Sequence, residues 1–565
     1  MLKLIKVALD IPINELFDYF SDDVRVSIGS RVKVPFGKTV RLGVIIDIKR
    51  PDNRQKKYIT KNIEMVIDDH PILSHEMIKI CKWASSYYHH PIGQVIFSVI
   101  TPLYRKIRKE PKSKLLLSSQ KVSSTLKLND EQNKVFNVLT KNKFNVSVIR
   151  GITGSGKTEL YIKIADEILK RNKQVLILVP EINLVPQTIE RFKRYLSIEP
   201  IEYHSNLTVV QKYKVSDICK SEGKLIVVGT RSSVFLPFEN LGLVVVDEEH
   251  DGSYKQTDSL KYNARDLGIL RSRNSDCPVI LGSATPSFET TLNIKNGKYN
   301  EFRLEKRFHK SSLPLVTIVD SSIDRPEEGI SNILRKSIKK ELDNNKKIIL
   351  FLGRRGFSNT VICSNCKTIV KCPRCDTYMT YHKGVEKLIC HACGYKEEFK
   401  QVKKCCDDPV LSPLGVGTER LESKIKKLFP GKNILRVDSD SISNKKDLEN
   451  FFKKARNNEI DIYIGTQMIV KGHDFDDISL VGIINIDSGL YSTDFRGLEK
   501  TAQLITQVAG RAGRQTQQGN VFIQTYNPNH RLLQIILHEG YEKFSEEAMR
   551  QRKSVNLPPY SHIGL

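Results

Sequence analysis

An apolar run that ends in a glycine-rich turn constrains the fold of this chain more than any other feature. Residues 145–150 read as a buried strand, and a segment with the spacing GxxxxGK[ST] follows at once. Glycines let backbone N–H groups wrap a phosphate chain, and a helix that starts near Lys157 points its positive end at the same anion. We therefore expect ATP to be bound by Gly151, Ile152, Thr153, Gly154, Ser155, Gly156, Lys157 and Thr158.

A second motif supplies the other half of the expected ATP site. Lys157 would neutralise the β- and γ-phosphates, and Thr158 would bind Mg²⁺. The apolar run 243–246 ends in Asp247, which would hold the magnesium through water, and in Glu248, the candidate base that activates the attacking water. The alternative, a glycine turn and an unrelated acidic loop, is disfavoured because both runs end where a doubly wound sheet places its ligands.

The rest of the chain repeats this strand–helix alternation twice. One set of apolar runs lies at 175–179, 225–228, 243–246 and 279–281, and a second set lies at 347–352, 434–437, 461–464, 481–486 and 521–525. Alternation of this kind is typical of parallel sheets covered by helices, so we predict an α/β protein with two such lobes.

Other segments differ from this pattern and suggest further domains. Residues 1–104 mix strands with a helical piece, and 32–37 with 41–48 read as a hairpin around a glycine turn. We divide the chain into an amino-terminal domain (1–104), a basic linker (105–126), a first lobe (127–310), a second lobe (311–360 and 408–530), a cysteine-rich insertion (361–407) and a carboxy-terminal segment (531–565).

The charge of the chain points to a polyanionic partner. Its 565 residues carry 90 Lys and Arg against 64 Asp and Glu, a net charge of +26. Such a field favours nucleic acid, although a lysine-rich solvated surface would give the same excess. No apolar run reaches the roughly eighteen residues that span a bilayer, and the start carries no secretory signal, so we expect no membrane partner, a cytoplasmic location and reduced thiols.

The cysteines cluster in one segment, which in a reducing compartment indicates metal rather than disulfides. Eight of the 11 cysteines lie within 363–406, most of them as CxxC pairs that aim two thiolates at one tetrahedral ion. We expect one structural zinc site from Cys372, Cys375, Cys390 and Cys393. A second Zn²⁺ would be bound by Cys363, Cys366, Cys405 and Cys406.

Three more residues are candidates for the ATP site. Gln132 precedes the glycine-rich turn and could read the adenine edge. Arg511 and Arg514 lie three apart on a predicted helix, so they would share a face and reach the γ-phosphate as arginine fingers do. The alternative is that each motif is a loop or a helix cap.

In their order, these motifs resemble those of superfamily 2 helicases, which have two RecA-like lobes. The chain resembles more closely the bacterial primosomal protein N′ (PriA) family of replication-restart helicases. This closer resemblance rests on residues 151–159, 247–256, 352–357 and 417–420 and on the embedded cysteine pairs. It implies an ATP-dependent 3′→5′ DNA helicase that recognises abandoned forks and initiates primosome assembly. The implied partners are forked and single-stranded DNA, primosome proteins, the replicative helicase loader and the single-stranded-DNA-binding protein.

The resemblance also implies two sets of DNA contacts. The small β-rich amino-terminal domain would capture a 3′ end of DNA in a pocket lined by Phe17, Asp18, Gly37 and Lys61. An aromatic-rich loop, 253–265, would couple DNA to ATP hydrolysis through Tyr254, Lys255, Tyr262 and Arg265. Aromatic and basic residues together suit base stacking and phosphate contact, although an ordinary surface loop has the same composition.

The chain departs from the family pattern in three places. The last cysteine pair would be CxxC with a partner at position 403, where this chain has Lys403, so adjacent Cys405 must replace it under strain, with His382 and His391 as spare donors. We expect this chain to lack the family's winged-helix domain before Gln132 and its carboxy-terminal DNA-binding domain after residue 565, as a reduced form or a truncation. Rival interpretations are an ATP-switched scaffold that does not unwind, a duplex translocase or RNA helicase, and a non-enzymatic zinc module.

Overall fold

The structure is a computed structural model, and it describes most of the chain. The described residues are 2–50, 60–106, 126–140, 143–152, 154–221, 223–305, 314–353, 361–363, 365–366, 368–375, 378–382, 385–390, 393–399, 405–407, 410–413, 417–438, 454, 457, 459–466, 469, 478–492, 494–512 and 518–562. Most of the predicted basic linker and the motif at 352–357 beyond Gly353 lie outside them.

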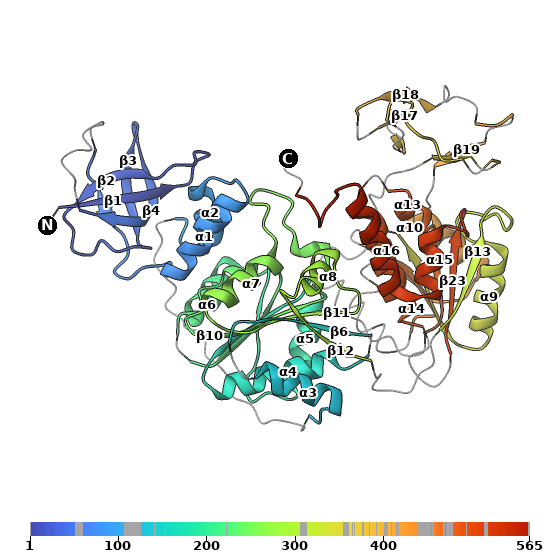
Figure 1. Ribbon diagram of the computed structural model, residues 1–565, viewed down its shortest axis with the longest axis horizontal. Helices are drawn as coiled ribbons and strands as arrows, with labels where there is room; N and C mark the ends of the chain where they lie inside the picture. Colours follow the sequence, from blue (N-terminus) through green and yellow to red (C-terminus); the bar gives the residue numbers. More distant parts are fainter. Residues whose placement is uncertain are drawn as a thin grey trace. The chain divides into compact units, whose positions relative to one another are not determined.

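The amino-terminal part is an antiparallel sheet followed by two helices (Figure 1). Its five strands, in the order β2-β1-β4-β3-β5, are β1 (Lys3–Leu9), β2 (Phe17–Ser21), β3 (Arg31–Phe36), β4 (Thr39–Lys49) and β5 (Met65–Val66). The predicted hairpin is present, because β3 and β4 pair antiparallel around the turn at Gly37. Ser74 caps the helix α1 (His75–Tyr87) by accepting a hydrogen bond from the Met77 N–H, and α2 (Ile92–Val99) follows.

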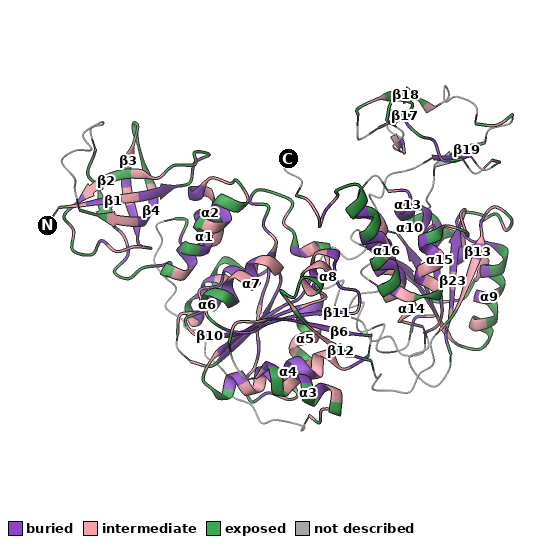
Figure 2. Cartoon of the chain, viewed as in Figure 1, coloured by how far each residue is buried: buried purple, intermediate pink, exposed green. Residues whose placement is uncertain are grey.

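The first lobe is a seven-stranded sheet in which every pair is parallel. Its order is β12-β6-β11-β10-β7-β9-β8, formed by β6 (Val146–Gly151), β7 (Gln174–Leu178), β8 (Ile201–Tyr203), β9 (Leu225–Gly229), β10 (Leu241–Asp247), β11 (Val279–Ser283) and β12 (Asn300–Leu304). The central strands are buried along nearly their whole length, because helices cover both faces of the sheet (Figure 2).

The two faces of this sheet have separate cores. One core contains residues of α3 (Asp130–Leu139), α4 (Lys157–Lys170) and α5 (Leu184–Lys193). The other contains residues of α6 (Val209–Cys219) and α7 (Ala264–Asn274). Two short 3-10 helices, η1 (Arg231–Phe235) and η2 (Gly252–Tyr254), follow strands β9 and β10 and contribute side chains to this second core.

The amino-terminal helices share the second of these cores. Met77 and Cys81 of α1 belong to the same buried cluster as Leu176 of β7 and Leu267 of α7. The fully buried Arg271 of α7 also forms an ion pair of 3.2 Å with Glu76 of α1. The amino-terminal part and the first lobe therefore form one compact unit, which comprises residues 1–151, 156–283 and 293–304.

The second lobe is a six-stranded parallel sheet in the other compact unit, which comprises residues 152–155, 284–292 and 305–565. Its order is β13-β23-β22-β14-β21-β20, formed by β13 (Leu315–Asp320), β14 (Lys347–Leu352), β20 (Ile434–Val437), β21 (Ile462–Gly465), β22 (Ile478–Ile484) and β23 (Asn520–Thr525). The prediction of two parallel α/β lobes is confirmed.

Helices cover both faces of the second sheet as well. One core holds residues of α9 (Asn332–Asp343) and α10 (Thr418–Leu428). The other holds residues of α14 (Gly497–Ala509), α15 (Arg531–His538) and α16 (Gly540–Ser554), and the short helix α13 (Asp487–Leu490) leads into it. Phe288, at the start of α8 (Phe288–Lys295), is buried in this same core.

The cysteine-rich insertion has only short strands. A two-stranded ladder joins β15 (Val361–Cys363) to β19 (Leu411–Pro413), and a small antiparallel sheet contains β16 (Thr380–His382), β17 (Lys387–Ile389) and β18 (Lys396–Glu398). Its apolar core is small and includes the side chains of Cys372 and Cys390. Among the described residues of the whole chain, no helix is both long and apolar enough to cross a bilayer.

Candidate active site and metal centres

The glycine-rich turn connects β6 to α4, as the sequence predicts. Gly154 and Gly156 have φ of +82° and +80°, a left-handed conformation that L side chains rarely adopt. The Lys157 ammonium donates a hydrogen bond of 2.8 Å to the Gly151 carbonyl, so it is held over the turn. The first N–H groups of α4, where Thr158 also lies, have no partner within the helix, which makes this end suitable for an anion. Thr153 lies outside the described residues.

Gln132 has a different role from the predicted one. It is fully buried, its Oε1 accepts from the Asn129 N–H at 2.9 Å, and its Nε2 donates to the Gly156 carbonyl at 3.1 Å. The Asn129 side chain accepts in turn from the Gln132 N–H, which completes a capping box at the start of α3. In this conformation Gln132 braces the glycine turn, and it offers no free edge to an adenine.

Asp247 lies at the carboxyl end of β10, with two tyrosine hydroxyls around it. Tyr161 donates to Asp247 Oδ1 at 3.3 Å, and Tyr254 donates to the Asp247 carbonyl at 2.6 Å. Burial, together with the neighbouring Glu248 carboxylate, raises the pKa of Asp247 to about 6, while the Lys157 ammonium acts in the opposite direction. Lys157 and Asp247 therefore interact electrostatically across the site, as the two motifs predict.

Glu248 combines a strained backbone with an unsatisfied carboxylate. Its φ of +47° lies in the left-handed region, which costs free energy for a residue other than glycine. Its Oε2 atom is buried and has no hydrogen-bond partner among the described residues, and His250 Nδ1 lies 3.6 Å from it. A buried carboxylate oxygen of this kind can accept a hydrogen bond from a water.

His250 connects the acidic motif to the next strand of the sheet. Its Nδ1 shares a hydrogen bond of 2.8 Å with the Ser283 hydroxyl at the end of β11. Chain residues 284–292 then belong to the second unit, where Glu499 of α14 accepts from the Phe288 N–H at 3.0 Å and Gln503 donates to the Thr285 carbonyl. The segment that follows Ser283 is thus fixed to the helix that precedes Arg511.

Two arginine candidates follow α14. Arg511 is half-buried and lies two residues past the end of that helix. Arg514 lies outside the described residues. Their approach to a nucleotide stays a prediction.

The aromatic residues of loop 253–265 are not a stacking surface in this structure. Tyr254 is 1% exposed, and its hydroxyl also donates to the Leu178 carbonyl at 2.9 Å. Tyr262 is buried and its ring packs edge-on against Phe235. Both rings serve the protein core, which corrects the sequence interpretation, because a ring covered by side chains cannot stack on a base.

The two basic residues predicted to contact DNA from this loop, Lys255 and Arg265, differ in exposure. Arg265 donates to the buried Glu249 carboxylate at 2.9 Å, so it is held in an internal ion pair rather than offered to DNA. Lys255 is exposed, and its ammonium lies 4.9 Å from the centre of the Tyr88 ring. Of the four residues predicted in this loop, Lys255 is the exposed one, and its ammonium donates to the Lys261 carbonyl.

The residues predicted to capture a DNA end lie on the amino-terminal sheet. Phe17, at the start of β2, packs edge-on against Phe36, which precedes the left-handed Gly37. Asp18 pairs with Lys6 of the neighbouring strand at 2.9 Å. The Lys61 carbonyl accepts from the Phe20 N–H, which places its backbone beside the same strand. Phe17 and Asp18 thus lie on β2, and the backbone of Lys61 lies beside the same strand.

In each of the two predicted cysteine groups, the four sulfur atoms lie close together. Four thiolates at about 2.3 Å from one ion in a tetrahedron lie roughly 3.8 Å from one another. In the first group, the sulfur atoms of Cys363 and Cys406 are 3.7 Å apart, and those of Cys366 and Cys405 are 3.3 Å apart. Both distances are short even though Cys405 and Cys406 are adjacent in the chain. In the second group the corresponding pairs, Cys372–Cys393 and Cys375–Cys390, are both 3.5 Å apart.

These spacings fit the chemistry of structural zinc. Within each group all four sulfur atoms lie within 4.8 Å of one another. Four soft thiolates leave no open coordination position for a reacting water, so both groups suit a structural ion rather than a catalytic one. The tetrahedral sets form without His382 or His391, the latter of which lies outside the described residues.

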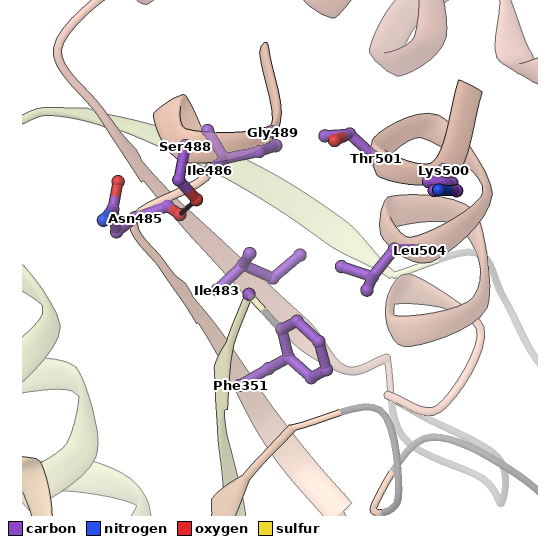
Figure 3. Close-up of a pocket in the computed structure, with 10 residues that line it drawn as sticks. Phe351, Ile483, Asn485, Ile486, Ser488, Gly489, Lys500, Thr501 and Leu504 are labelled. Carbon is purple, nitrogen blue, oxygen red and sulfur yellow. Dashed lines mark hydrogen bonds between the residues drawn. The ribbon is translucent and has the colours of Figure 1, made fainter. Parts of the chain in front are cut away.

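The second lobe has a pocket of its own, at the carboxyl ends of β14 and β22 (Figure 3). Phe351, Ile483 and Leu504 form its apolar wall. Asn485, with a left-handed φ of +58°, and Lys500, paired with Asp494 at 2.6 Å, lie at its polar side. Ligands of parallel α/β sheets bind at the carboxyl ends of the strands, so the pocket lies at the edge of the second lobe where a ligand is expected.

Comparison with known proteins identifies the class of this molecule. Residues 6–101 match a 3′ DNA-binding domain, 129–294 match the DEAD/DEAH box helicases, and 372–397 match the Cys-rich region domain of the PriA DNA helicase. Together with the glycine turn and Asp247, these matches define an ATP-dependent DNA helicase with a zinc-binding Cys-rich region.

Curated relatives identify the family. The replication restart protein PriA of Haemophilus influenzae is 36% identical over 640 residues, which cover 100% of this chain and 88% of the relative. PriA of Rickettsia felis is 36% identical and covers 99% of this chain and 86% of the relative, and that of Bacillus subtilis is 37% identical over 79% of this chain and 56% of the relative. The chain belongs to the replication restart protein PriA family.

Proposed function

We propose that this chain unwinds DNA with 3′→5′ polarity at stalled or abandoned replication forks and initiates primosome assembly there. The observation that carries the proposal is the presence, in one chain, of residues 129–294, which match the DEAD/DEAH box helicases, and residues 6–101, which match a 3′ DNA-binding domain. A domain that holds a 3′ end beside a motor favours movement away from that end. Such a protein acts on chromosomal DNA and therefore in the cytoplasm.

Each residue of the ATP site has a proposed role. Lys157 neutralises the β- and γ-phosphates, and Glu248 accepts a proton from the attacking water through its unsatisfied carboxylate. Thr158 and Asp247 would hold Mg²⁺, which would supply positive charge to stabilise the phosphates in the transition state. Arg511 and Arg514 are the proposed arginine fingers. Movement of the lobes with each round of hydrolysis would drive the strand through the protein.

Protein partners complete the proposed role. Restart requires that the replicative helicase be reloaded, so the proposed partners are primosome proteins, the replicative helicase loader and the single-stranded-DNA-binding protein. The two zinc-binding groups are proposed to hold the small sheet of β16, β17 and β18 in shape, because its apolar core is too small to do so alone.

The Lys157→Ala variant tests the motor. We expect loss of ATP hydrolysis by a factor of about a thousand or more, with fork binding retained, because the ammonium acts on the phosphates and not on DNA. Lys170→Ala is the matched control: this exposed lysine ends the same helix and pairs with Asp166 at 2.7 Å.

Strand separation is measured on duplexes with a single-stranded arm at either the 3′ or the 5′ side. The proposal requires that the wild-type protein and Lys170→Ala separate the strands with ATP and that Lys157→Ala does not. Unchanged ATP turnover in Lys157→Ala would refute the phosphate role, and fork binding without any unwinding by the wild-type protein would make it a scaffold.

A further inference from the structure

Helix α1 carries an aromatic cluster at its carboxyl end that the ATP site does not use. The rings of Trp83 and Tyr87 are stacked, with centroids 4.7 Å apart and planes 10° apart. Tyr88 meets both rings edge-on, at 5.9 Å from Trp83 and 4.9 Å from Tyr87. The three rings form a rigid block at the end of the helix (α1 in Figure 1).

One flat face of this block is open. Tyr87 is 55% exposed, whereas Trp83 and Tyr88 are half-buried and pack against the core of the first lobe. Because the Trp83 ring backs the Tyr87 ring, the outer face of Tyr87 is held in one orientation. A pre-ordered aromatic face binds a planar ligand without losing side-chain freedom, and nucleobases stack on such faces whatever their sequence.

Positive charge lies beside the block. Lys79 and Lys82 of α1 are exposed, and Lys79 is one helical turn before Trp83 on the same face. Lys255, from loop 253–265, holds its ammonium 4.9 Å from the centre of the Tyr88 ring. The neighbouring carboxylate of Asp266 forms an ion pair of 2.9 Å with Arg265. Cations around an aromatic face match a phosphate backbone with unstacked bases.

We propose that Trp83 and Tyr87 form a stacking platform for a base of single-stranded DNA, with Lys79, Lys82 and Lys255 on the flanking phosphates. The platform is separate from the residues around β2 that are predicted to hold a 3′ end. This proposal depends on the proposed function in one respect, namely that the ligand is DNA.

The platform is also joined to the acidic motif of the ATP site. The Asn263 N–H donates to the Tyr88 hydroxyl oxygen at 3.1 Å, and Lys255 covers the same ring. The residue before Lys255 is Tyr254, whose hydroxyl donates to the Asp247 carbonyl at 2.6 Å. Loop 253–265 therefore contacts both Tyr88 and the end of strand β10 at Asp247.

Trp83 is the only tryptophan of the chain, so its fluorescence reports on the platform alone. The test titrates the full-length protein, without nucleotide, with an oligothymidylate whose 3′ end is phosphorylated to keep it from a 3′-end pocket. We expect quenching of Trp83 on binding. In Tyr87→Ala the affinity measured by anisotropy of a labelled oligonucleotide should fall about 5- to 100-fold, and Tyr87→Phe should restore it because the ring is retained.

Two controls make the outcome decisive. Val138→Ala removes a similarly exposed apolar side chain (49%) from α3 of the same unit and should change nothing. Equal affinities for wild type, Tyr87→Ala and Tyr87→Phe, or no quenching at saturating DNA, would overturn the proposal and leave the platform to a protein partner. Because no ATP is present, failure here is distinguishable from failure of the motor.

Discussion

At the scale of single residues, the glycine turn shows how one missing Cβ shapes the ATP site. A Cβ on Gly156 would lie 2.2 Å from Gln132 Nε2, whereas a Cβ on Gly154 would meet no described atom within 4 Å. Both glycines are left-handed, so a substitution at either strains the backbone. A comparison of substitutions at the two positions therefore distinguishes the cost of backbone strain, which both share, from the cost of collision with Gln132, which occurs only at Gly156.

We expect Gly156→Ala to lower the free energy of unfolding by about 1–3 kcal/mol more than Gly154→Ala, because only the former displaces Gln132. Urea denaturation without nucleotide measures this difference. Gln132→Ala in the Gly156→Ala background should recover part of the loss, since the colliding group is then gone. Equal destabilisation by Gly154→Ala and Gly156→Ala would mean that the brace contributes nothing.

At the scale of elements, the cysteine-rich insertion depends on metal more than on apolar packing. Its strands are three residues long, and its core contains two of the proposed ligands, Cys372 and Cys390. Binding of a structural zinc contributes roughly 10–16 kcal/mol in small domains, which exceeds what so few apolar side chains supply.

The adjacent pair at 405–406 gives the sharpest test of the first zinc group. We expect about two zinc ions per chain in the wild-type protein and about one in Cys405→Ser, because a hydroxyl is a poor replacement for a thiolate. Metal content by atomic absorption is the measurement. His382→Ala is the control and should keep both ions, since the four sulfur atoms already converge. Loss of an ion in His382→Ala, with none lost in Cys405→Ser, would move the fourth ligand to the histidine.

At the scale of the whole molecule, the net charge of +26 governs how the chain meets DNA. Each lysine or arginine that contacts a phosphate releases a condensed counterion, so affinity falls as salt rises. If about six phosphates are contacted, the affinity for a fork should fall roughly a thousandfold between about 50 and 200 mM salt. Anisotropy titrations over a salt series measure the slope, with sucrose at matched osmolality as the control. An affinity that stays flat would show that the positive charge is solvated surface and not a docking face.

Much of this molecule follows from local sequence pattern. The central strands of both lobes lie within a residue or three of their predicted bounds, because a strand buried on both faces must be a continuous apolar run. The edge strands β8, β12 and β13 escaped prediction, since they are short or carry polar side chains on an exposed face. The glycine turn, Asp247 and the CxxC pairs were readable because their chemistry fixes residue type at fixed spacing.

Only the tertiary structure determined which of these side chains are buried and which are exposed to a ligand. Tyr254 and Tyr262 have the composition of a stacking loop, yet packing against η1 and β10 buries both rings, and the exposed aromatic face instead lies on α1. Gln132 braces a turn that lies 24 residues away in the chain. A sequence states which side chains are available, but burial depends on which distant segments pack together. That long-range packing, rather than the local motif, determines which groups meet a ligand.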